Sequence, residues 1–435
     1  MAAFIEPRIL KGFRDFLPSA EITRRKLLEK IEASFRSYGF VPIDTPALEY
    51  AEILLGKGGG ETEKQIYRFK DNGGRDVALR FDLTVPFARF LAEHRSELNF
   101  PFKRYHIAKV WRGENTQRGR YREFTQCDFD TIGSDSAACD FEILHIMRNT
   151  LLAISGGDVI IRLNHRGLFN RFLSRLDILD KSVDILRTVD KLGKIGRDET
   201  LALLSQFVGS GKAEEILGFI GISGSFDETL SAMTAAAGEG PQSDRLKLIR
   251  DFITDAGIGG SIVLDPSITR GLDYYTGVVF ESFLADLPGI GSVCSGGRYD
   301  DLVGLYTADK KFALTGVGAS IGIDRLIAGL EALGRLETEL SSANAAIACV
   351  SETAGGACQA LAEKLRRAGL PCEVFLEEEK LSKQYQLAEK KGIRWLIIPD
   401  SESPLSGSLT LRDLQKRENR EGVKVEEIAG IMTKD

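Results

Sequence analysis

The sequence predicts an α+β protein in which helices flank an antiparallel sheet, with a helical insertion and a smaller α/β domain at the C-terminal end. Three patterns predict this. Several β-like runs before residue 165 are joined by segments that carry Gly, Asn and Asp, as in antiparallel hairpins. Leu and Ile recur at helical spacing through residues 165–255. Strand and helix patterns alternate beyond residue 344.

The composition is that of a globular protein. Of 435 residues, 43% are hydrophobic and 28% charged, and the formal net charge is −6. These values exclude a disordered chain, a collagen and a small disulfide scaffold. At about 150 residues per domain, the length fits two or three domains. No run approaches the ~20 apolar residues of a membrane span, and the first residues lack a signal-peptide core, so we expect a cytoplasmic protein without membrane contact.

Cysteine and histidine spacing gives no sign of a metal centre. The six Cys are far apart with no CxxC pair, which is typical of reduced cytosolic thiols. The four His show no HxxxH pair. We therefore expect no built-in metal.

The elements of the first part follow from apolar spacing. A helix is predicted over 20–38 because its apolar residues recur at helical spacing and Gly39 ends it. The next segment, 40–46, contains two prolines, so we expect an edge or interface strand. Further strands are predicted at 66–69, 77–81, 104–111, 123–131 and 158–163, with helices at 83–95 and 138–154.

After the helical segment, strand signals return at 261–264 and 277–283, and a helix is predicted over 319–333. A polar stretch of small residues, 337–344, indicates a linker. The alternation beyond it predicts a mixed sheet. We therefore divide the chain into four parts, 1–164, 165–255, 256–336 and 344–435.

The most strongly charged segment is 103–122, which holds seven Lys or Arg and one acid. Strand alternation predicts Arg112 and Glu114 on one face of a hairpin, with Arg120 and Arg122 returning on its second strand. Arginines at a hairpin tip can clamp phosphates through bidentate hydrogen bonds. The alternative is a solvated, charged hairpin. The interleaved aromatic and apolar residues indicate one buried face, which favours phosphate binding.

Three further clusters allow two interpretations each. Residues 270–277 combine Arg, Asp and two Tyr, which fits a polar pocket as well as a tight turn with packing tyrosines. The paired Gly at 296–297 fit a close ligand approach, although a β-turn is the commoner reason for them. Residues 316–325 look like a phosphate loop before a helix, but Ile321 holds the third Gly position of G-x-G-x-x-G.

Together these segments resemble the histidyl-tRNA synthetases, a family of class II aminoacyl-tRNA synthetases. Pro46 is similar to the motif 1 proline at the family's dimer interface. Arg112-Gly113-Glu114 resembles the Arg-x-Glu of motif 2, and Gly322-Ile323-Asp324-Arg325 resembles motif 3, with Asp324 where the family has Glu. Segments 270–275 and 295–300 resemble the two histidine-specific signatures.

Two more segments, 80–84 and 126–130, resemble the eukaryotic and archaeal style of the family. The resemblance implies a class II synthetase core made of 1–164, with motifs 1 and 2, and of 256–336, with the histidine-specific motifs and motif 3. It also implies a helical insertion domain at 165–255 and an anticodon-binding domain at 344–435.

The activity implied by the resemblance is that of a histidine–tRNA ligase, which uses ATP with Mg²⁺ and acts on L-histidine and tRNA-His as a homodimer. The implied catalytic residues are Arg112, Arg270 and Arg325. These three would also bind ATP, together with Glu114 and Arg120. The residues implied to bind histidine are Asp82, Thr84, Gln126, Asp130, Tyr274 and Tyr275.

Two other functions fit parts of the pattern. A histidine-sensing regulator, such as the regulatory subunit of ATP phosphoribosyltransferase, uses the same core but lacks the C-terminal domain and tends to lose the ATP arginines. An RNA-binding module without catalysis would not need Arg112, Arg270 and Arg325 together. Residues 358–417 carry eleven Lys or Arg and nine acids, which by charge alone fits RNA binding and a solvated surface equally well.

Overall fold

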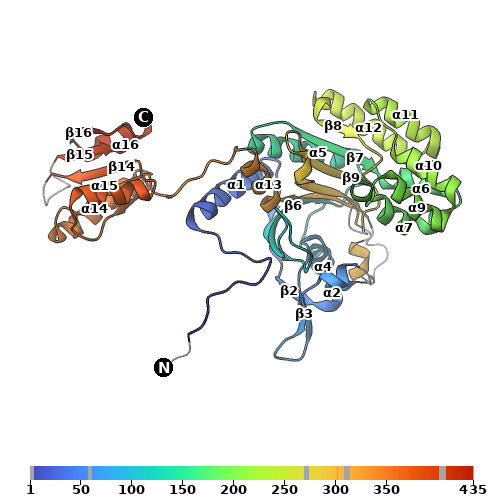
Figure 1. Cartoon of the computed structure of the whole chain (residues 1–435), viewed down its shortest axis with the longest axis horizontal. Helices are drawn as coiled ribbons and strands as arrows, with labels where there is room; N and C mark the ends of the chain where they lie inside the picture. The colour runs from blue at the N-terminus through green and yellow to red at the C-terminus, as the bar shows by residue number, and fades with distance from the viewer. Residues whose placement is uncertain are drawn as a thin grey trace. The chain divides into compact units, whose positions relative to one another are not determined.

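The computed structural model describes residues 4–56, 61–268, 274–300, 302–307, 314–400 and 408–434. The chain divides into two compact units (Figure 1). Unit 1 comprises Met1–Arg14 and Leu27–Leu336, and unit 2 comprises Asp15–Lys26 and Glu337–Asp435. None of the helices in the described ranges is long and apolar enough to cross a membrane.

Unit 1 is built on an eight-stranded sheet whose order is β1-β5-β6-β11-β10-β9-β7-β8. The outermost pairs, β1 with β5 and β7 with β8, are parallel, and the other pairs are antiparallel. The predicted antiparallel sheet is therefore confirmed, with the proline-containing strand β1 at its edge. The strands are β1 (Val41–Pro42), β5 (Phe102–Trp111), β6 (Glu123–Ile132), β7 (Val159–His165), β8 (Ile262–Leu264), β9 (Val278–Leu284), β10 (Cys294–Tyr299) and β11 (Gly316–Gly322).

Two central strands of the sheet, β10 and β11, were not predicted from the sequence. Gly296 and Gly297 lie within β10, so the β-turn interpretation of this pair is wrong. Residues 316–322 form β11 rather than a phosphate loop, and α13 (Ile323–Ala332) begins later than the helix predicted from residue 319. Gly is rare in ordinary strands, so the Gly-rich segments that form β10 and β11 did not look like strands in the sequence. Here it is required for space, because a Cβ on Gly318 would lie 2.0 Å from Oδ1 of Asp130.

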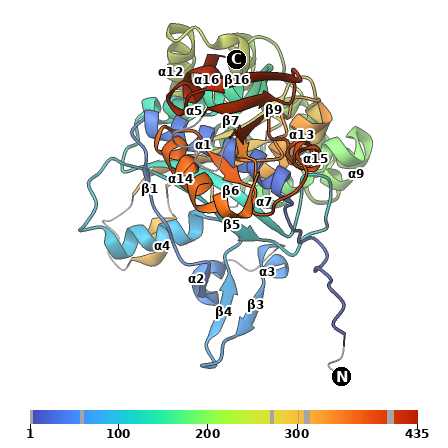
Figure 2. The same ribbon diagram turned by 90° about the vertical axis from the view of Figure 1, so that its left-hand side faces the viewer.

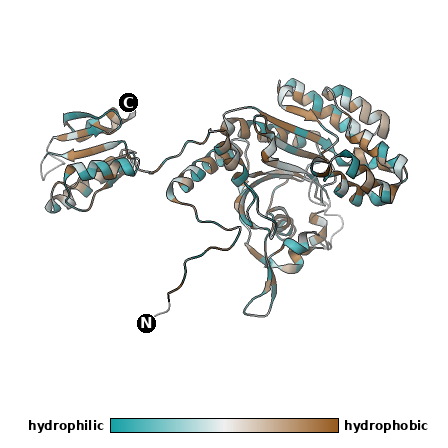
Figure 3. Ribbon diagram, in the orientation of Figure 1, coloured by the Kyte–Doolittle hydropathy of each residue, from teal (hydrophilic) through white to brown (hydrophobic). Residues whose placement is uncertain are grey.

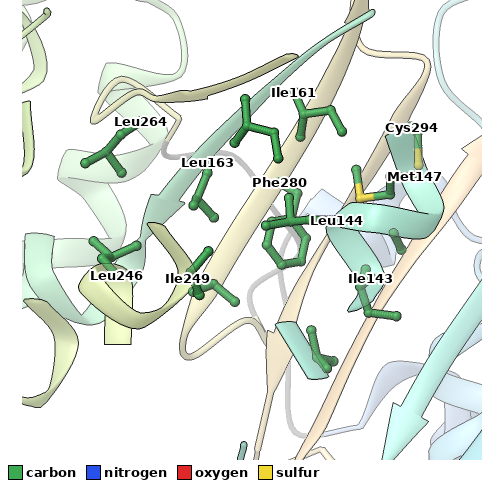
Figure 4. Packing of buried hydrophobic residues seen from close by; sticks show 14 of the residues in the cluster. Ile143, Leu144, Met147, Ile161, Leu163, Leu246, Ile249, Leu264, Phe280 and Cys294 are labelled. Carbon is green, nitrogen blue, oxygen red and sulfur yellow. The ribbon is translucent and has the colours of Figure 1, made fainter. Parts of the chain in front are cut away.

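Helices cover the sheet and complete its core. Helix α5 (Ala137–Ser155) places Ile143, Leu144 and Met147 against Phe280 and Cys294 of the sheet (Figure 4). Helix α1 (Pro18–Ser37) contributes apolar residues at helical spacing to the same core, namely Leu27, Ile31 and Phe35. The strands are largely hydrophobic in Figure 3, as expected for a sheet that helices cover.

The segment after β7 is helical, as its Leu and Ile spacing predicts, and it shares the core of unit 1. Leu246 and Ile249 of its last long helix lie near Leu163 and Leu264 of the sheet (Figure 4). The helices are α6 (Arg166–Arg175), α7 (Ser182–Val189), α8 (Leu192–Ile195), α9 (Arg197–Val208), α10 (Ser210–Ile220), α11 (Phe226–Ala237) and α12 (Pro241–Asp255).

A small antiparallel sheet with the order β2-β4-β3 projects from unit 1 (Figure 2). Its strands are β2 (Leu48–Tyr50), β3 (Arg68–Lys70) and β4 (Asp76–Leu79), and the nearby helices are α2 (Ala51–Leu55), α3 (Glu61–Gln65) and α4 (Thr84–His94). The chain between β4 and α4 carries Asp82, so this sheet fixes one wall of the cavity described below.

Unit 2 contains a mixed sheet with the order β13-β12-β14-β15-β16, as predicted. Strand β12 is parallel to β13 and β14, and β15 is antiparallel to β14 and β16. Helix α14 packs into one apolar core and α15 into another. The elements are β12 (Ala345–Ile347), α14 (Gly355–Arg367), β13 (Cys372–Val374), α15 (Leu381–Lys390), β14 (Trp395–Pro399), β15 (Leu409–Asp413), β16 (Glu418–Val423) and α16 (Val425–Lys434).

Candidate active site

One polar cavity of about 310 Å³ lies in unit 1, over β6, β11 and β10. Ten of the eleven residues singled out from the sequence line it. They are Asp82, Thr84, Arg112, Glu114, Arg120, Gln126, Asp130, Tyr274, Tyr275 and Arg325. The eleventh, Arg270, lies outside the described residues.

Buried carboxylates occupy one end of this cavity. The alternation of β6 points Asp128 and Asp130 into it, and Asp82 comes from the segment before α4. All three are at most 3% exposed. Burial raises the pKa of Asp82 to about 6 and that of Asp128 to about 7, and it also raises the pKa of Asp130.

Two of these carboxylates have partners within the protein. The Asp130 carboxylate forms an ion pair of 2.7 Å with Arg104 and accepts a 2.5 Å hydrogen bond from the Tyr299 hydroxyl. Asp82 accepts the Val85 amide hydrogen bond at 3.1 Å. Sequence analysis missed Arg104 and Tyr299 as cavity-shaping residues, although Arg104 is directly opposite Asp130 in the β5–β6 pairing.

Aromatic rings close this end of the cavity. The rings of Tyr274 and Tyr275 meet edge to face with their centroids 5.0 Å apart. Tyr275 lies over Gly297, where a Cβ would be 2.9 Å from its ring. Gly297 therefore makes room for a tyrosine that shapes the pocket, while Gly296, the other member of the pair, lines the cavity.

Arginines occupy the other end. Arg112 donates from Nε to the Phe81 carbonyl at 2.9 Å, and its guanidinium lies 5.2 Å from the centre of the Phe124 ring. Arg325 donates from Nη1 to the Ser292 carbonyl at 2.6 Å. Burial, and next the nearby Arg120, lower the pKa of Arg325 to about 10. Both guanidinium groups are fixed by backbone carbonyls and are oriented before any ligand binds.

The basic hairpin differs from its predicted form. Strand β5 ends at Trp111 and β6 begins at Glu123, so Arg112, Glu114, Arg120 and Arg122 all lie in the connecting loop and not on the strands. The loop bends sharply enough that alternation no longer decides direction. In consequence the guanidinium of Arg122 donates to the carbonyls of Lys11 and Glu114, and it does not line the cavity.

The tip of this loop packs on the start of α13. Gly119 has φ +72°, and a Cβ there would lie 3.0 Å from the Cα of Arg325. Glycine is required at this position for both its left-handed backbone and the close approach. The contact places Arg120, Glu114 and Arg325 at the same end of the cavity.

Asp324 connects three segments that are far apart in the sequence, because it pairs with Arg14 and accepts a hydrogen bond from Thr125. It is 4% exposed, and the hydrogen bond from the Thr125 amide is 2.9 Å long. The Arg14 guanidinium also lies 3.6 Å from the centre of the Tyr121 ring. Arg14 precedes α1, and its role as an anchor was not apparent from the sequence.

The arrangement is therefore polarised. Fixed guanidinium groups at one end suit a polyphosphate, and buried carboxylates with aromatic walls at the other suit a small cationic or N–H-bearing ligand. A reaction between a bound carboxylate and a phosphate would take place where the two ends meet.

Comparison with known proteins agrees with this geometry. Residues 12–326 match the family model for histidyl-tRNA synthetase, and residues 344–435 match the model for an anticodon binding domain. The histidine–tRNA ligase of Treponema denticola is 53% identical over 433 residues, covering 96% of each chain. That of Rhodopirellula baltica is 45% identical over 428 residues, covering 96% of this chain and 95% of the relative.

A solved structure extends the similarity to the whole fold. The crystal structure of histidyl-tRNA synthetase from a Nostoc species superposes with a TM-score of 0.87 at 32% identity, covering 99% of this chain and all of that one.

Proposed function

The chain belongs to the histidyl-tRNA synthetase family, and we propose that the polarised cavity of unit 1 is the place where its two-step reaction occurs. The chain is a histidine–tRNA ligase, which activates L-histidine with ATP to histidyl-adenylate and transfers histidine to the 3′ end of tRNA-His. The observation that carries the assignment of the site is the meeting of fixed arginines and buried carboxylates in one cavity.

The first step needs positive charge and no general base. The nucleophile is the histidine carboxylate, which is already an anion, and negative charge accumulates on the α-phosphate in the transition state. Arg112 would hold the α-phosphate beside the histidine carboxylate, and Arg325 would bind the γ-phosphate. Arg270 would approach the α-phosphate from the opposite side, as the family resemblance implies.

The rest of the loop would hold ATP. Arg120 would contact the γ-phosphate, and Glu114 would accept a hydrogen bond from the adenine amino group or brace the loop. The carboxylates of Glu114 and Glu281 both line the arginine end of the cavity.

The family uses ATP with a divalent metal ion, and we propose Mg²⁺, which prefers phosphate oxygens with one or two carboxylates. Glu281 fits that requirement and would hold the ion together with the phosphate oxygens. The metal would neutralise phosphate charge.

The carboxylate end would bind histidine. Asp82, Thr84 and Gln126 would surround the α-ammonium, and Tyr274 and Tyr275 would line the side-chain pocket beside Asp130. An imidazole presents both a donor and an acceptor nitrogen. A pocket built for both rejects apolar side chains of the same shape, because its own polar groups would be left unpaired.

The tRNA would contact more than the cavity. We propose that 1–164 and 256–336 form the catalytic core, 165–255 a helical insertion domain and 344–435 the anticodon-binding domain. The tRNA substrate and the free cysteines fit a cytoplasmic protein.

We also propose a homodimer through the edge of unit 1. There β1 exposes 46% of Val41, and the neighbouring small sheet exposes 50% of Tyr50 and 47% of Phe69. Sedimentation equilibrium tests this, because a mass of one chain at micromolar concentration would contradict it.

The decisive experiment is ATP–pyrophosphate exchange with each of the twenty amino acids in turn. We expect exchange with histidine alone. Binding of histidine without exchange would indicate a regulator instead. Charging of tRNA-His transcripts with and without an extra 5′ guanosine would then test the second step and define the acceptor end that the enzyme reads.

A further inference from the structure

Three buried carboxylates line the cavity, and two of them have ion-pair or hydrogen-bond partners within the protein. Asp130 forms an ion pair with Arg104 and accepts a hydrogen bond from the Tyr299 hydroxyl. Asp82 accepts a hydrogen bond from the Val85 amide and lies 3.5 Å from the Tyr274 hydroxyl. Asp128 is the third. It lies in segment 126–130, where the family resemblance implies roles for Gln126 and Asp130 only.

Asp128 has an open acceptor. It is 2% exposed and lines the cavity, and its Oδ1 has no hydrogen-bond partner among the described residues. Ser320 lies opposite Asp128 in the β6–β11 pairing, and its hydroxyl oxygen accepts a 3.0 Å hydrogen bond from Nε2 of Gln126. A buried acceptor without a partner is rare in folded proteins unless a water, an ion or a ligand completes it.

The glycines of β11 leave space on the cavity side of the sheet. Gly318 and Gly322 flank Ser320 and pair with Asp130 and Gln126 across the sheet. Side chains at these two positions would point to the same face as Asp128. The Asp130 carboxyl takes the space over Gly318, whereas the space over Gly322 is open and leaves room for a ligand near the carboxylate of Asp128.

Two acceptors at this end, Asp128 Oδ1 and Gln126 Oε1, have no partner in the described part of the chain and call for a donor from outside the protein. Three carboxylates lie around the fully buried guanidinium of Arg104, which is in ion-pair contact with Asp130. A ligand that brings one cationic group and one or more N–H donors would satisfy the remaining acceptors. Histidine is such a ligand.

Position along β6 separates the two parts of histidine. The strand begins beside the arginine loop at Glu123, so Gln126, Asp128 and Asp130 lie progressively farther from Arg112. The reacting carboxylate must lie at the Arg112 end, with the ammonium next to it. The ammonium of histidine is bonded directly to Cα, whereas the ring is joined to Cα through one methylene group. The ring therefore lies farther along β6 from Arg112, beside Asp128.

We propose that Asp128 is a specificity-determining residue whose open Oδ1 accepts a hydrogen bond from a ring N–H of bound histidine. This rests on the proposed location of the histidine site. Asp128 then helps to select histidine by recognising the ring N–H, while Asp130 is held by its partners in the protein and shapes the pocket.

The test compares Asp128→Asn with Asp265→Asn, a carboxylate outside the cavity that pairs with Arg162. In histidine-dependent ATP–pyrophosphate exchange, we expect Asp128→Asn to raise the KM for histidine at least tenfold and to change the KM for ATP less than twofold. Asp265→Asn should change neither. An unchanged KM for histidine, or an equal rise in both constants, would overturn the proposal.

The wild-type enzyme provides a second test that requires no variant. A methyl group on the ring nitrogen that faces Asp128 removes the hydrogen bond, so one of the two N-methyl isomers of histidine should be at least a hundredfold poorer in kcat/KM. Asp128→Asn should narrow that gap. Equal use of histidine and both isomers by the wild type would contradict the role of Asp128.

The experiments distinguish failure of the proposed function from failure of the role of Asp128. If the wild type shows no histidine-dependent exchange, the proposed function itself is wrong. If the wild type exchanges normally and both tests above are negative, only the assignment of Asp128 is wrong.

Discussion

Arg104 and Asp130 face each other across β5 and β6, with the guanidinium Nη2 and the carboxylate Oδ2 2.7 Å apart and both side chains almost fully buried. The guanidinium also lies 4.1 Å from the centre of the Phe87 ring. The pair therefore fixes the position of the Asp130 side chain, which lines the cavity, and it lies between the sheet and α4.

Breaking this pair should destabilise the fold. Arg104→Met leaves the Asp130 carboxylate buried without its partner, and such a loss typically costs about 3–5 kcal/mol of the free energy of unfolding. Urea unfolding at neutral pH measures it. The double variant Arg104→Met/Asp130→Asn should recover part of the loss, because the Asp130 charge that Arg104 pairs with is removed as well. Equal stability of the single variant and the wild type would contradict this account.

Gly119 should control ATP binding through Arg325. Gly119→Ala forces a strained φ and pushes the loop away from the Arg325 backbone, so the KM for ATP should rise about tenfold, equivalent to about 1.4 kcal/mol. Gly74→Ala is the matched control, because Gly74 has φ +76° with open space around its Cβ position. It should leave the KM unchanged. A similar KM in both variants would show that the loop contact has no role.

Arg270 should be required for adenylate formation. Arg270→Ala should cost at least ~3 kcal/mol of transition-state stabilisation, a loss typical of removing an oxyanion donor. Histidine-dependent exchange gives the rate. Arg335→Ala, which removes a cation paired with Asp286 outside the cavity, should exchange normally. Near-normal exchange in Arg270→Ala would refute the role.

His165 should make the protein sensitive to acid. Burial, with Arg245 and then Arg298 nearby, lowers its pKa to about 4, against about 6.5 in the unfolded chain. Between these values the unfolded chain binds a proton that the native state does not, so the free energy of unfolding decreases as pH falls from 6.5 to 4.

The loss should be on the order of 2–3 kcal/mol at pH 4. His165→Asn keeps the acceptor that caps α6 and removes the titration, so it should lose less stability over the same range. Urea unfolding of both proteins at pH 7 and pH 4.5 gives the difference. Parallel losses would show that His165 does not titrate as proposed.

Sequence patterns predicted the helices and the outer strands well, because their apolar residues follow regular spacing. They missed β10 and β11 because Gly297 and Gly318 are required by the side chains that cover them, Tyr275 and Asp130, and Gly296 by the close approach of Gly318 and Ala319 of β11. Strand propensity does not predict these positions, because these contacts exist only after distant segments have met.

The site was predictable where residues act through short motifs. Arg112 and Arg325 could be located because each lies in a segment that resembles the family. Arg104 and Asp128 could not be weighed in the same way, because their importance depends on partners that face them across the sheet. Strand alternation from Gln126 would have placed Asp128 on the cavity face, and this is the signal that could have found it.

The tie between Arg14 and Asp324 has a consequence for synthesis of the chain on the ribosome. The two residues are separated by 310 positions, so the segment that carries Arg14 must wait for one of the last segments of unit 1 before it finds its partner. A nascent chain that ends before Asp324 lacks Arg325 and the tie behind the arginine end of the cavity, so such a partly made polypeptide should be unable to consume ATP.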